Sequence, residues 1–369
     1  MLNKKHYKYL HIITAKDLKF VASMVKMIKL PSNGFNIDEH VFIVSNKDVY
    51  DGLREFGDNI VLDEITKDWF QTYDKYCDWF ISHGYFDKKK GMILKNKIKN
   101  KIVFRYWGGR KPLPKKRNGK IVTNLIISIY SVAYKMIYKH IYGHFALIGI
   151  ANIVDKIDLG DLITDVPMMK MPYSLGSYDL TKTIAERPKE HTDYVNVIIG
   201  HRSDRAERHI HYIDLLQKYA DKNIKIFVPL SYGDKEYAEE VKRYVSNKNV
   251  KNVIIIDQFM EFPVYLNFLH EMDIAIIDGE TSCALGNIGI HIRFGNTLYI
   301  SRTGIIRKAF DCEKVPYRCL DELENASFES FCNLIKYNRA VGKEFISKPY
   351  TTQVKQWHEV FNYLESKRY

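Results

Sequence analysis

Apolar and polar positions along the chain follow two patterns: short apolar runs, and longer segments with an apolar residue at every third or fourth position. The short runs predict buried strands, and the longer period predicts helices. In the first half, strands are predicted at 9–13, 41–44, 59–62, 102–106, 145–150 and 166–169. Helices are predicted at 18–30, 69–85 and 124–142, and Pro31 ends the first of them.

The second half repeats this alternation more regularly. Strands are predicted at 195–199, 224–228, 253–256, 274–277 and 297–300, and helices at 206–219, 235–246, 262–272 and 282–290. Strands that alternate with helices are typical of parallel sheets covered on both faces. Residues 172–194 have prolines, glycine and no period, which indicates a linker.

The predicted fold is therefore α/β, with two doubly wound, Rossmann-like domains that face each other across a cleft. The domains are residues 1–171 and 195–342, joined by the linker at 172–194, and a closing helix is predicted at 343–369.

Composition changes this picture only in what it implies about partners. The 369 residues are 46% hydrophobic and 27% charged, which is ordinary for a globular protein, but the net charge is +12. This positive charge predicts an anionic partner, which could be nucleic acid, anionic lipid or a phosphorylated small molecule. The five cysteines contain no C-x-x-C pair, which argues against a disulfide framework or a zinc site and fits a reducing cytoplasm.

The two most apolar segments do not predict a membrane span or a signal peptide. The N-terminal apolar run is followed at once by Thr14 and Lys16, so a first strand is expected there. Residues 121–154 are interrupted by Lys135, Lys139 and His140, and cannot supply about 20 continuous apolar residues.

Three arginines crowd the start of the helix that follows strand 195–199. Gly200 ends the strand, and Asp204 with Glu207 predicts a capping box. Arg202, Arg205 and Arg208 then lie at or near a helix N-terminus, where each cation is unfavourable by up to about 1 kcal/mol. We therefore expect an anion to offset them.

Four loops after strands of the second half are rich in Gly, Ser, Thr, Arg or Asp: 200–209, 229–234, 278–287 and 301–304. The carboxyl ends of parallel strands share one sheet edge, where ligands bind. Any one of these loops is more often structural than functional, but together they favour an anion site. The candidate contacts are Gly200, Arg202, Ser203, Asp204, Arg205, His209, Pro229, Ser231, Tyr232, Glu280, Gly286 and Asn287.

Several nucleotide-binding motifs are missing from the sequence. It has no P-loop and no G-x-G-x-x-G after the first strand, which disfavours a motor-type hydrolase and a dinucleotide enzyme. It also has no Asp-x-Asp; the segment 278–280, Asp-Gly-Glu, comes nearest. If a diphosphate binds, arginine and helix dipole are expected to replace a metal, and no cofactor is expected.

The first half offers an aromatic and basic region. Trp107, Gly108, Gly109 and Arg110 follow a predicted strand, and this group forms either a wall for a sugar ring or a core tryptophan with a tight turn. Residues 88–120 are densely basic, and helix 124–142 interleaves Ile, Tyr and Lys. That helix either lies on an anionic bilayer or is buried in the core.

These residues resemble the 4-acetamido-4,6-dideoxygalactose (Fuc4NAc) transferases of enterobacterial common antigen synthesis and their broader glycosyltransferase family. The similar segments are Gly200-x-x-x-Asp204-Arg205-x-x-x-His209, Val228 to Tyr232, Glu236 to Val241, Ala284 to Asn287 and Tyr106 to Gly109. Arg110 stands where family members carry Asp, and His201 and Arg202 replace small polar residues.

The resemblance implies a GT-B glycosyltransferase that binds a nucleotide sugar without metal and uses a polyprenyl-diphosphate-linked acceptor. The first domain would then bind the acceptor and the second the donor, at the cytoplasmic face of a bacterial membrane. In that case the arginines hold the leaving diphosphate, and Asp17 or His11 supplies the base. Two alternatives stay open: a nucleotide-sugar epimerase of the same architecture, and a nucleic-acid-binding protein without enzymatic activity.

Overall fold

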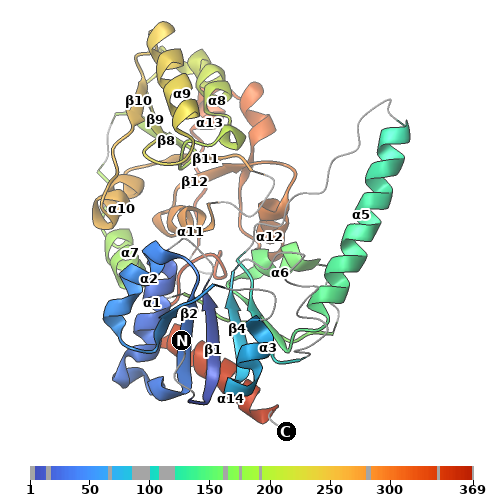
Figure 1. Ribbon diagram of the computed structural model, residues 1–369. Coiled ribbons are helices and arrows are strands. Elements are labelled where there is room, and N and C mark those ends of the chain that lie inside the picture. Colours follow the sequence, from blue (N-terminus) through green and yellow to red (C-terminus); the bar gives the residue numbers. More distant parts are fainter. Residues whose placement is uncertain are drawn as a thin grey trace. The chain divides into compact units, whose positions relative to one another are not determined.

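Two parallel β-sheets organise the chain, one in each of two units (Figure 1). The computed structural model describes residues 5–13, 18–64, 69–84, 100–107, 121–160, 165–173, 177–190, 193–279, 284–338 and 341–367. Unit 1 comprises Met1–Gly176 and Lys348–Tyr369, and unit 2 comprises Ser177–Ser347.

The sheet of unit 1 has seven strands in the order β3-β2-β1-β4-β5-β6-β7, and all the pairs are parallel. The strands are β1 Tyr7–Ile13, β2 His40–Val44, β3 Ile60–Leu62, β4 Cys77–His83, β5 Ile102–Arg105, β6 Leu147–Ile150 and β7 Met168–Lys170. Because β1 and β4 are neighbours in the sheet but not in sequence, the winding direction reverses between them.

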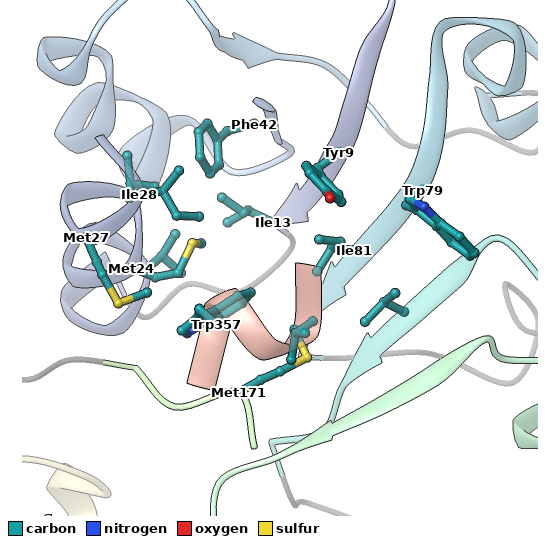
Figure 2. Close-up of a cluster of buried hydrophobic side chains, with 14 of the residues drawn as sticks. Tyr9, Ile13, Met24, Met27, Ile28, Phe42, Trp79, Ile81, Met171 and Trp357 are labelled. Carbon is teal, nitrogen blue, oxygen red and sulfur yellow. The ribbon is translucent and has the colours of Figure 1, made fainter. Parts of the chain in front are cut away.

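Helices cover both faces of this sheet. They are α1 Leu18–Lys29, α2 Lys47–Leu53, α3 Trp69–Tyr73, α5 Ile121–Tyr142, α6 Ile153–Leu159 and α14 Tyr350–Ser366. Trp357 of α14 is fully buried beside Ile13, Ile81 and Met171 (Figure 2). Its indole N–H donates to the carbonyl of Pro172 at 2.7 Å. The last helix of the chain thus completes the core of the first unit.

The sheet of unit 2 has six parallel strands in the order β10-β9-β8-β11-β12-β13. The strands are β8 Val195–Ile199, β9 Ile224–Pro229, β10 Val253–Ile256, β11 Ile274–Ile277, β12 Thr297–Ile300 and β13 Arg318–Cys319. The helices are α7 Ser177–Ala185, α8 His209–Leu216, α9 Lys235–Asn247, α10 Phe262–His270, α11 Leu285–Phe294, α12 Ile305–Glu313 and α13 Phe328–Phe331. The prediction of two doubly wound α/β domains is confirmed.

Two predicted boundaries differ from the structure. Residues 69–85 are not one helix, because the chain leaves α3 after Tyr73 and forms the central strand β4. Short apolar runs do not distinguish helix from strand by period alone. Residues 172–194 are not a continuous linker, since α7 lies within them and belongs to unit 2.

The long helix α5 is exposed along most of its length. Only its C-terminal end, including Ile141 and Tyr142, packs into the core of unit 1. Six apolar side chains of its earlier turns are 58% to 72% exposed: Val122, Leu125, Ile126, Ile129, Val132 and Met136. The alternative of a buried core helix is therefore wrong for those turns. Within the described residues, no helix has the length and apolarity that crossing a bilayer requires.

Candidate functional site

The winding of the unit 2 sheet reverses between β8 and β11, so their carboxyl ends mark the place where such sheets bind ligands. Gly200 follows β8 there, and its N–H donates to the carbonyl of Ile276 at 2.9 Å. Its φ is 69°, in the left-handed region that favours glycine. The loop that follows therefore starts at the reversal point; the sequence predicts its place at the carboxyl end of the strand but not the strand order.

A buried carboxylate fills the inside of this loop. Glu207 is 5% exposed, and its Oε2 accepts the backbone N–H of His201 at 2.8 Å and of Arg202 at 3.4 Å. Its Oε1 lies 2.5 Å from Nδ1 of His201. These two backbone donors lie within the loop that the sequence assigns to an anion, and the carboxylate of Glu207 accepts from both.

The predicted capping box between Asp204 and Glu207 is wrong in its second half. Asp204 accepts from the N–H of Ala206 at 3.0 Å, which caps a 3₁₀ turn at Arg205–Glu207. The carboxylate of Glu207 does not accept from the N–H of Asp204, as a capping box requires, but from those of His201 and Arg202. Arg208 has a φ of 49°, and α8 starts only at His209.

His209 is fully buried beneath the same loop, with Nε2 at 3.5 Å from Oε2 of Glu207. Burial holds the pKa of His209 below its usual value, although the nearby Glu207 acts in the opposite direction. Its ring nitrogens have no hydrogen-bond partner among the described residues. A neutral ring in this position packs under the loop and does not reach its surface.

Each of the three arginines is paired with a carboxylate of unit 2. Nη2 of Arg202 donates to Asp204 at 2.6 Å, and Nη2 of Arg205 lies 2.7 Å from Glu240 on α9. Nε of Arg208 donates to Asp278, which is almost buried after β11. The protein itself thus supplies the negative charge that the sequence assigned to a ligand. All three arginine side chains remain accessible, with 41%, 57% and 53% of their surface exposed.

The loops after β8 and β9 are joined by hydrogen bonds. The N–H and hydroxyl of Ser203 donate to the carbonyl of Tyr232 at 2.9 and 2.8 Å, and the N–H of Asp234 donates back to Ser203 at 2.7 Å. A Cβ at Gly233 would lie 2.4 Å from the Ser203 carbonyl oxygen, so the approach requires glycine. Pro229 ends β9, Ser231 is half-buried, and the Tyr232 ring remains 50% exposed.

The start of α11 lies after β11 and carries no side-chain cap. Ala284 at its N-cap is left-handed with a φ of 53°, and no acidic residue lies in the first turn. A Cβ at Gly286 would meet nothing within 4 Å. The Asn287 side chain bonds the hydroxyl of Tyr265. First-turn N–H groups that have no side-chain cap among the described residues suit an anion. Glu280 lies outside the described residues.

On the first unit, the structure describes only part of the predicted acceptor side. Trp107 is half-buried, and its ring lies edge-on to Tyr173 with 5.2 Å between centroids. His11 is fully buried, and its two ring nitrogens lie 2.9 Å from His83 and 2.9 Å from His40. Direct contact of His11 with a substrate is therefore not possible in this arrangement. Asp17, Gly108, Gly109 and Arg110 lie outside the described residues.

A family model described as 4-alpha-L-fucosyltransferase, glycosyl transferase group 56, matches residues 71–363. The match extends from α3 in unit 1 to α14, and includes all of unit 2. The chain belongs to this family. It is therefore a glycosyltransferase, which decides against the epimerase and against a binding protein without enzymatic activity.

Solved structures show the same fold at low sequence identity. A glycosyltransferase from Rickettsia africae ESF-5 is 10% identical, with a TM-score of 0.61 over 98% of this chain and 100% of that one. HepE of Anabaena, solved with UDP and glucose, is 10% identical, with a TM-score of 0.53 over 97% and 100%. Sucrose-phosphate synthase from Thermosynechococcus elongatus is 10% identical, with a TM-score of 0.53 over 98% and 100%. The fold is thus of the GT-B class.

Sequence reasoning missed several residues of both units. It treated Glu207 only as a cap, and no sequence signal distinguishes a buried carboxylate from a capping one. It also missed His83, because 69–85 was predicted as a helix. His40 and Tyr173 carry no local motif, and only the strand register brings them together with His11.

Proposed function

We propose that this glycosyltransferase moves a deoxy or acetamido sugar from a nucleoside diphosphate to a saccharide carried on a polyprenyl diphosphate, in the synthesis of a bacterial surface glycan. The family assignment carries the proposal, since its description names a fucosyltransferase and fucose is a 6-deoxy sugar. The segments that resemble the Fuc4NAc transferases support the lipid-linked acceptor. Unit 2 would bind the donor and unit 1 the acceptor.

The donor diphosphate is assigned to the carboxyl ends of β8 and β11. Open amides at the start of α11, near Gly286 and Asn287, are suitable donors to its oxygens. The exposed ring of Tyr232 is available for the base or the ribose. Groups that stabilise charge on the departing diphosphate lower the barrier to glycosyl transfer.

An arginine would bind the donor diphosphate by giving up its present carboxylate partner. Arg205 is exposed and held by Glu240 and, at 3.9 Å, by Asp234. Exposed ion pairs contribute little to stability, and a doubly charged diphosphate attracts a guanidinium more strongly than one carboxylate does. We assign Arg205 to the diphosphate, with Arg202 or Arg208 beside it.

Donor binding without a metal is a further part of the proposal. The sequence has no Asp-x-Asp, and the nearest carboxylate to such a pair, Asp278, accepts from Arg208 and from the Tyr212 hydroxyl. Both donors bind Oδ2 of Asp278, so this oxygen is already neutralised by a guanidinium.

We further assign α5 to an anionic membrane surface, which fits an acceptor anchored in a bilayer. Exposed apolar residues recur at intervals of three and four along this helix, at Val122, Leu125, Ile129, Val132 and Met136, and Ile126 lies on the same stripe. The sequence just before the helix, 110–120, contains six Lys or Arg residues. An apolar stripe next to basic residues is typical of helices that lie on anionic bilayers.

A thermal-shift screen tests the donor part of this proposal. UDP, TDP, GDP and CDP are compared with the corresponding monophosphates, in the presence of EDTA. We expect one nucleoside diphosphate to raise the unfolding temperature, whereas the corresponding monophosphate should change it little. Stabilisation that appears only when magnesium or manganese is added would contradict metal-independent binding. The absence of any shift would contradict the assignment of unit 2 as the donor site.

A further inference from the structure

Three buried histidines of unit 1 form one continuous line of hydrogen bonds. Nδ1 of His40 lies 2.9 Å from Nε2 of His11, and Nδ1 of His11 lies 2.9 Å from Nε2 of His83. Nδ1 of His83 lies 2.7 Å from the hydroxyl of Tyr173. The rings are 0% to 2% exposed, so solvent does not supply alternative partners.

The strand register explains why these three rings meet. His40 lies opposite Tyr9, His11 opposite Phe42 and Ile81, and His83 opposite Ile13. Side chains two residues apart point to the same face of a sheet, so positions 9, 11 and 13 share one face. The histidines therefore form a diagonal across β2, β1 and β4, on the face that α14 covers.

All three rings are held neutral. Burial lowers the pKa of His40 to about 3, with a further contribution from Lys8, and it lowers the pKa of His83 to about 3, with a further contribution from Arg105. The pKa of His11 is also well below its usual value, because of burial and its two histidine neighbours. A neutral imidazole has one N–H and one bare nitrogen.

Only two proton arrangements satisfy every contact in such a line. If Tyr173 donates to His83, each ring carries its proton on Nε2, and the tyrosine oxygen, which also accepts from the Trp107 indole, keeps its second lone pair for a ligand. If His83 donates to Tyr173, each ring carries its proton on Nδ1, and the tyrosine is left to donate. The direction of the Tyr173 hydrogen is thus coupled to His40, three hydrogen bonds away.

Tyr173 ends this line where the sheet of unit 1 reverses its winding. His83 is the last residue of β4, whose carboxyl end lies beside that of β1. The Tyr173 side chain is half-buried, and its ring is held by the guanidinium of Arg105 at 5.0 Å and by the edge of Trp107. Arg105 is in turn buried, 3.7 Å from Asp155. The tyrosine therefore has a fixed ring at the expected ligand position of this unit.

Packing alone does not require this arrangement. The same face of the sheet is otherwise lined by Ile13, Phe42, Ile81 and other apolar side chains. Buried polar groups cost stability unless each finds a partner, so three imidazoles in this core need every one of these contacts. A line that ends at a tyrosine beside the expected ligand position of this unit is explained if the tyrosine hydroxyl contacts a ligand there.

We propose that the Tyr173 hydroxyl contacts the acceptor saccharide, and that His83, His11 and His40 are positioning residues that set the direction of its hydrogen. The identity of the acceptor rests on the function proposed above. The line would allow Tyr173 to change from accepting to donating without placing a charge in the core.

Histidine tautomers test the line without any substrate. In the full chain labelled with ¹⁵N-histidine, NMR assigns the protonated nitrogen of each ring. We expect His11, His40 and His83 to share one tautomer, and Tyr173→Phe to change the nitrogen shifts of all three. Tyr350→Phe is the control, since that hydroxyl accepts from Asn33 at 2.6 Å, away from the line. Mixed tautomers, or a change confined to His83, would overturn the coupling.

A double-mutant cycle tests the role at the acceptor. The donors are the fucose and Fuc4NAc derivatives of the nucleotide that the thermal-shift screen identifies, and transfer is measured to a lipid extract of bacterial membranes. We expect Tyr173→Phe to lower kcat at least tenfold, with an unchanged KM for the donor. His40→Leu should lower kcat in the wild-type background, His40→Asn should restore most of it, and His40→Leu should add nothing in Tyr173→Phe. Additive losses, or an unchanged kcat in Tyr173→Phe, would overturn the assignment. If the wild-type protein transfers no sugar although the three histidines share one tautomer, the result would contradict the proposed function and not the histidine line.

Discussion

The carboxylate of Glu207 lies directly beneath Gly200, at the end of the first strand of unit 2. A Cβ on residue 200 would be 2.0 Å from Oε2 of Glu207 and 2.7 Å from Nε2 of His209. The residue also has a φ of 69°, which side chains rarely adopt. Two independent constraints thus require glycine at the entrance to the candidate donor site.

Replacing this glycine should unfold unit 2 more easily. We expect Gly200→Ala to lower the free energy of unfolding by about 2–5 kcal/mol, from a left-handed alanine and from overpacking against Glu207. Gly295→Ala is the matched control, because Gly295 has a φ of 78° but a methyl group there would meet nothing within 4 Å. Urea unfolding followed by circular dichroism measures both variants. Equal losses would show that the contact with Glu207 has no effect.

The arginines should separate binding from stability. Arg205 is exposed, and its described contacts are surface ion pairs and a cation–π contact with the ring of Tyr237 at 4.9 Å. Arg205→Ala should therefore change the unfolding midpoint only slightly and abolish stabilisation by the nucleoside diphosphate. Thermal unfolding with and without the nucleotide measures both effects. Full stabilisation of this variant would move the diphosphate to another part of unit 2.

Arg208 should behave in the opposite way in the absence of nucleotide. Its partner Asp278 is only 7% exposed and would keep one donor among the described residues, the Tyr212 hydroxyl at 2.9 Å. Arg208→Ala should therefore cost about 1 kcal/mol of unfolding free energy, measured by urea titration. Arg208→Lys, which keeps the charge, should recover part of that loss. No loss in the alanine variant would show that Tyr212 alone satisfies Asp278.

The sequence predicts most strands of both sheets because β8, β9, β11 and β12 are short apolar runs between polar loops. It also places Gly200 and Tyr232 at one sheet edge, because the carboxyl ends of parallel strands in one sheet share an edge whatever the strand order. It does not predict the partners of the arginines. Glu240 lies 35 positions after Arg205, and Asp278 lies 70 after Arg208, and no local pattern connects such residues.

The histidine line shows the same limit in unit 1. His11 stands out in the sequence as a polar residue inside an apolar run, and it was expected to act on substrate. Its true partners come from β2 and β4, and the second of these strands was predicted as part of a helix. Register between distant strands depends on tertiary packing, which a single sequence does not display.

Unit 1 should be sensitive to acid because of these histidines. Their pKa values are lower in the folded protein than in the unfolded chain, so the unfolded chain binds more protons below about pH 6.5. The contribution of these histidines to the free energy of unfolding is therefore fully present above about pH 6.5. It falls as the pH decreases from there toward about 3. Each group contributes up to about 1.4 kcal/mol per pH unit.

Urea unfolding at pH 7, 6 and 5 measures this dependence. We expect His40→Gln to reduce the slope by about one such contribution, after correction for its stability at pH 7. His140→Gln is the control, because His140 is exposed on α5 and should leave the slope unchanged. A slope that does not respond to His40→Gln would show that His40 is not neutral and buried in the folded state.

The apolar stripe of α5 gives the last prediction, which concerns the membrane. Burial of an aliphatic side chain in a bilayer contributes roughly 1.5–3 kcal/mol, so Ile126→Glu should lower the partition coefficient onto anionic vesicles by at least tenfold. Ser131→Glu is the matched control, because it adds the same charge on the opposite side of the helix, where the Ser131 hydroxyl donates to the carbonyl of Ile127 at 2.7 Å. Sedimentation with vesicles of phosphatidylglycerol and phosphatidylcholine measures both. If the two variants weaken binding equally, the effect comes from net charge alone, and the stripe does not enter the bilayer.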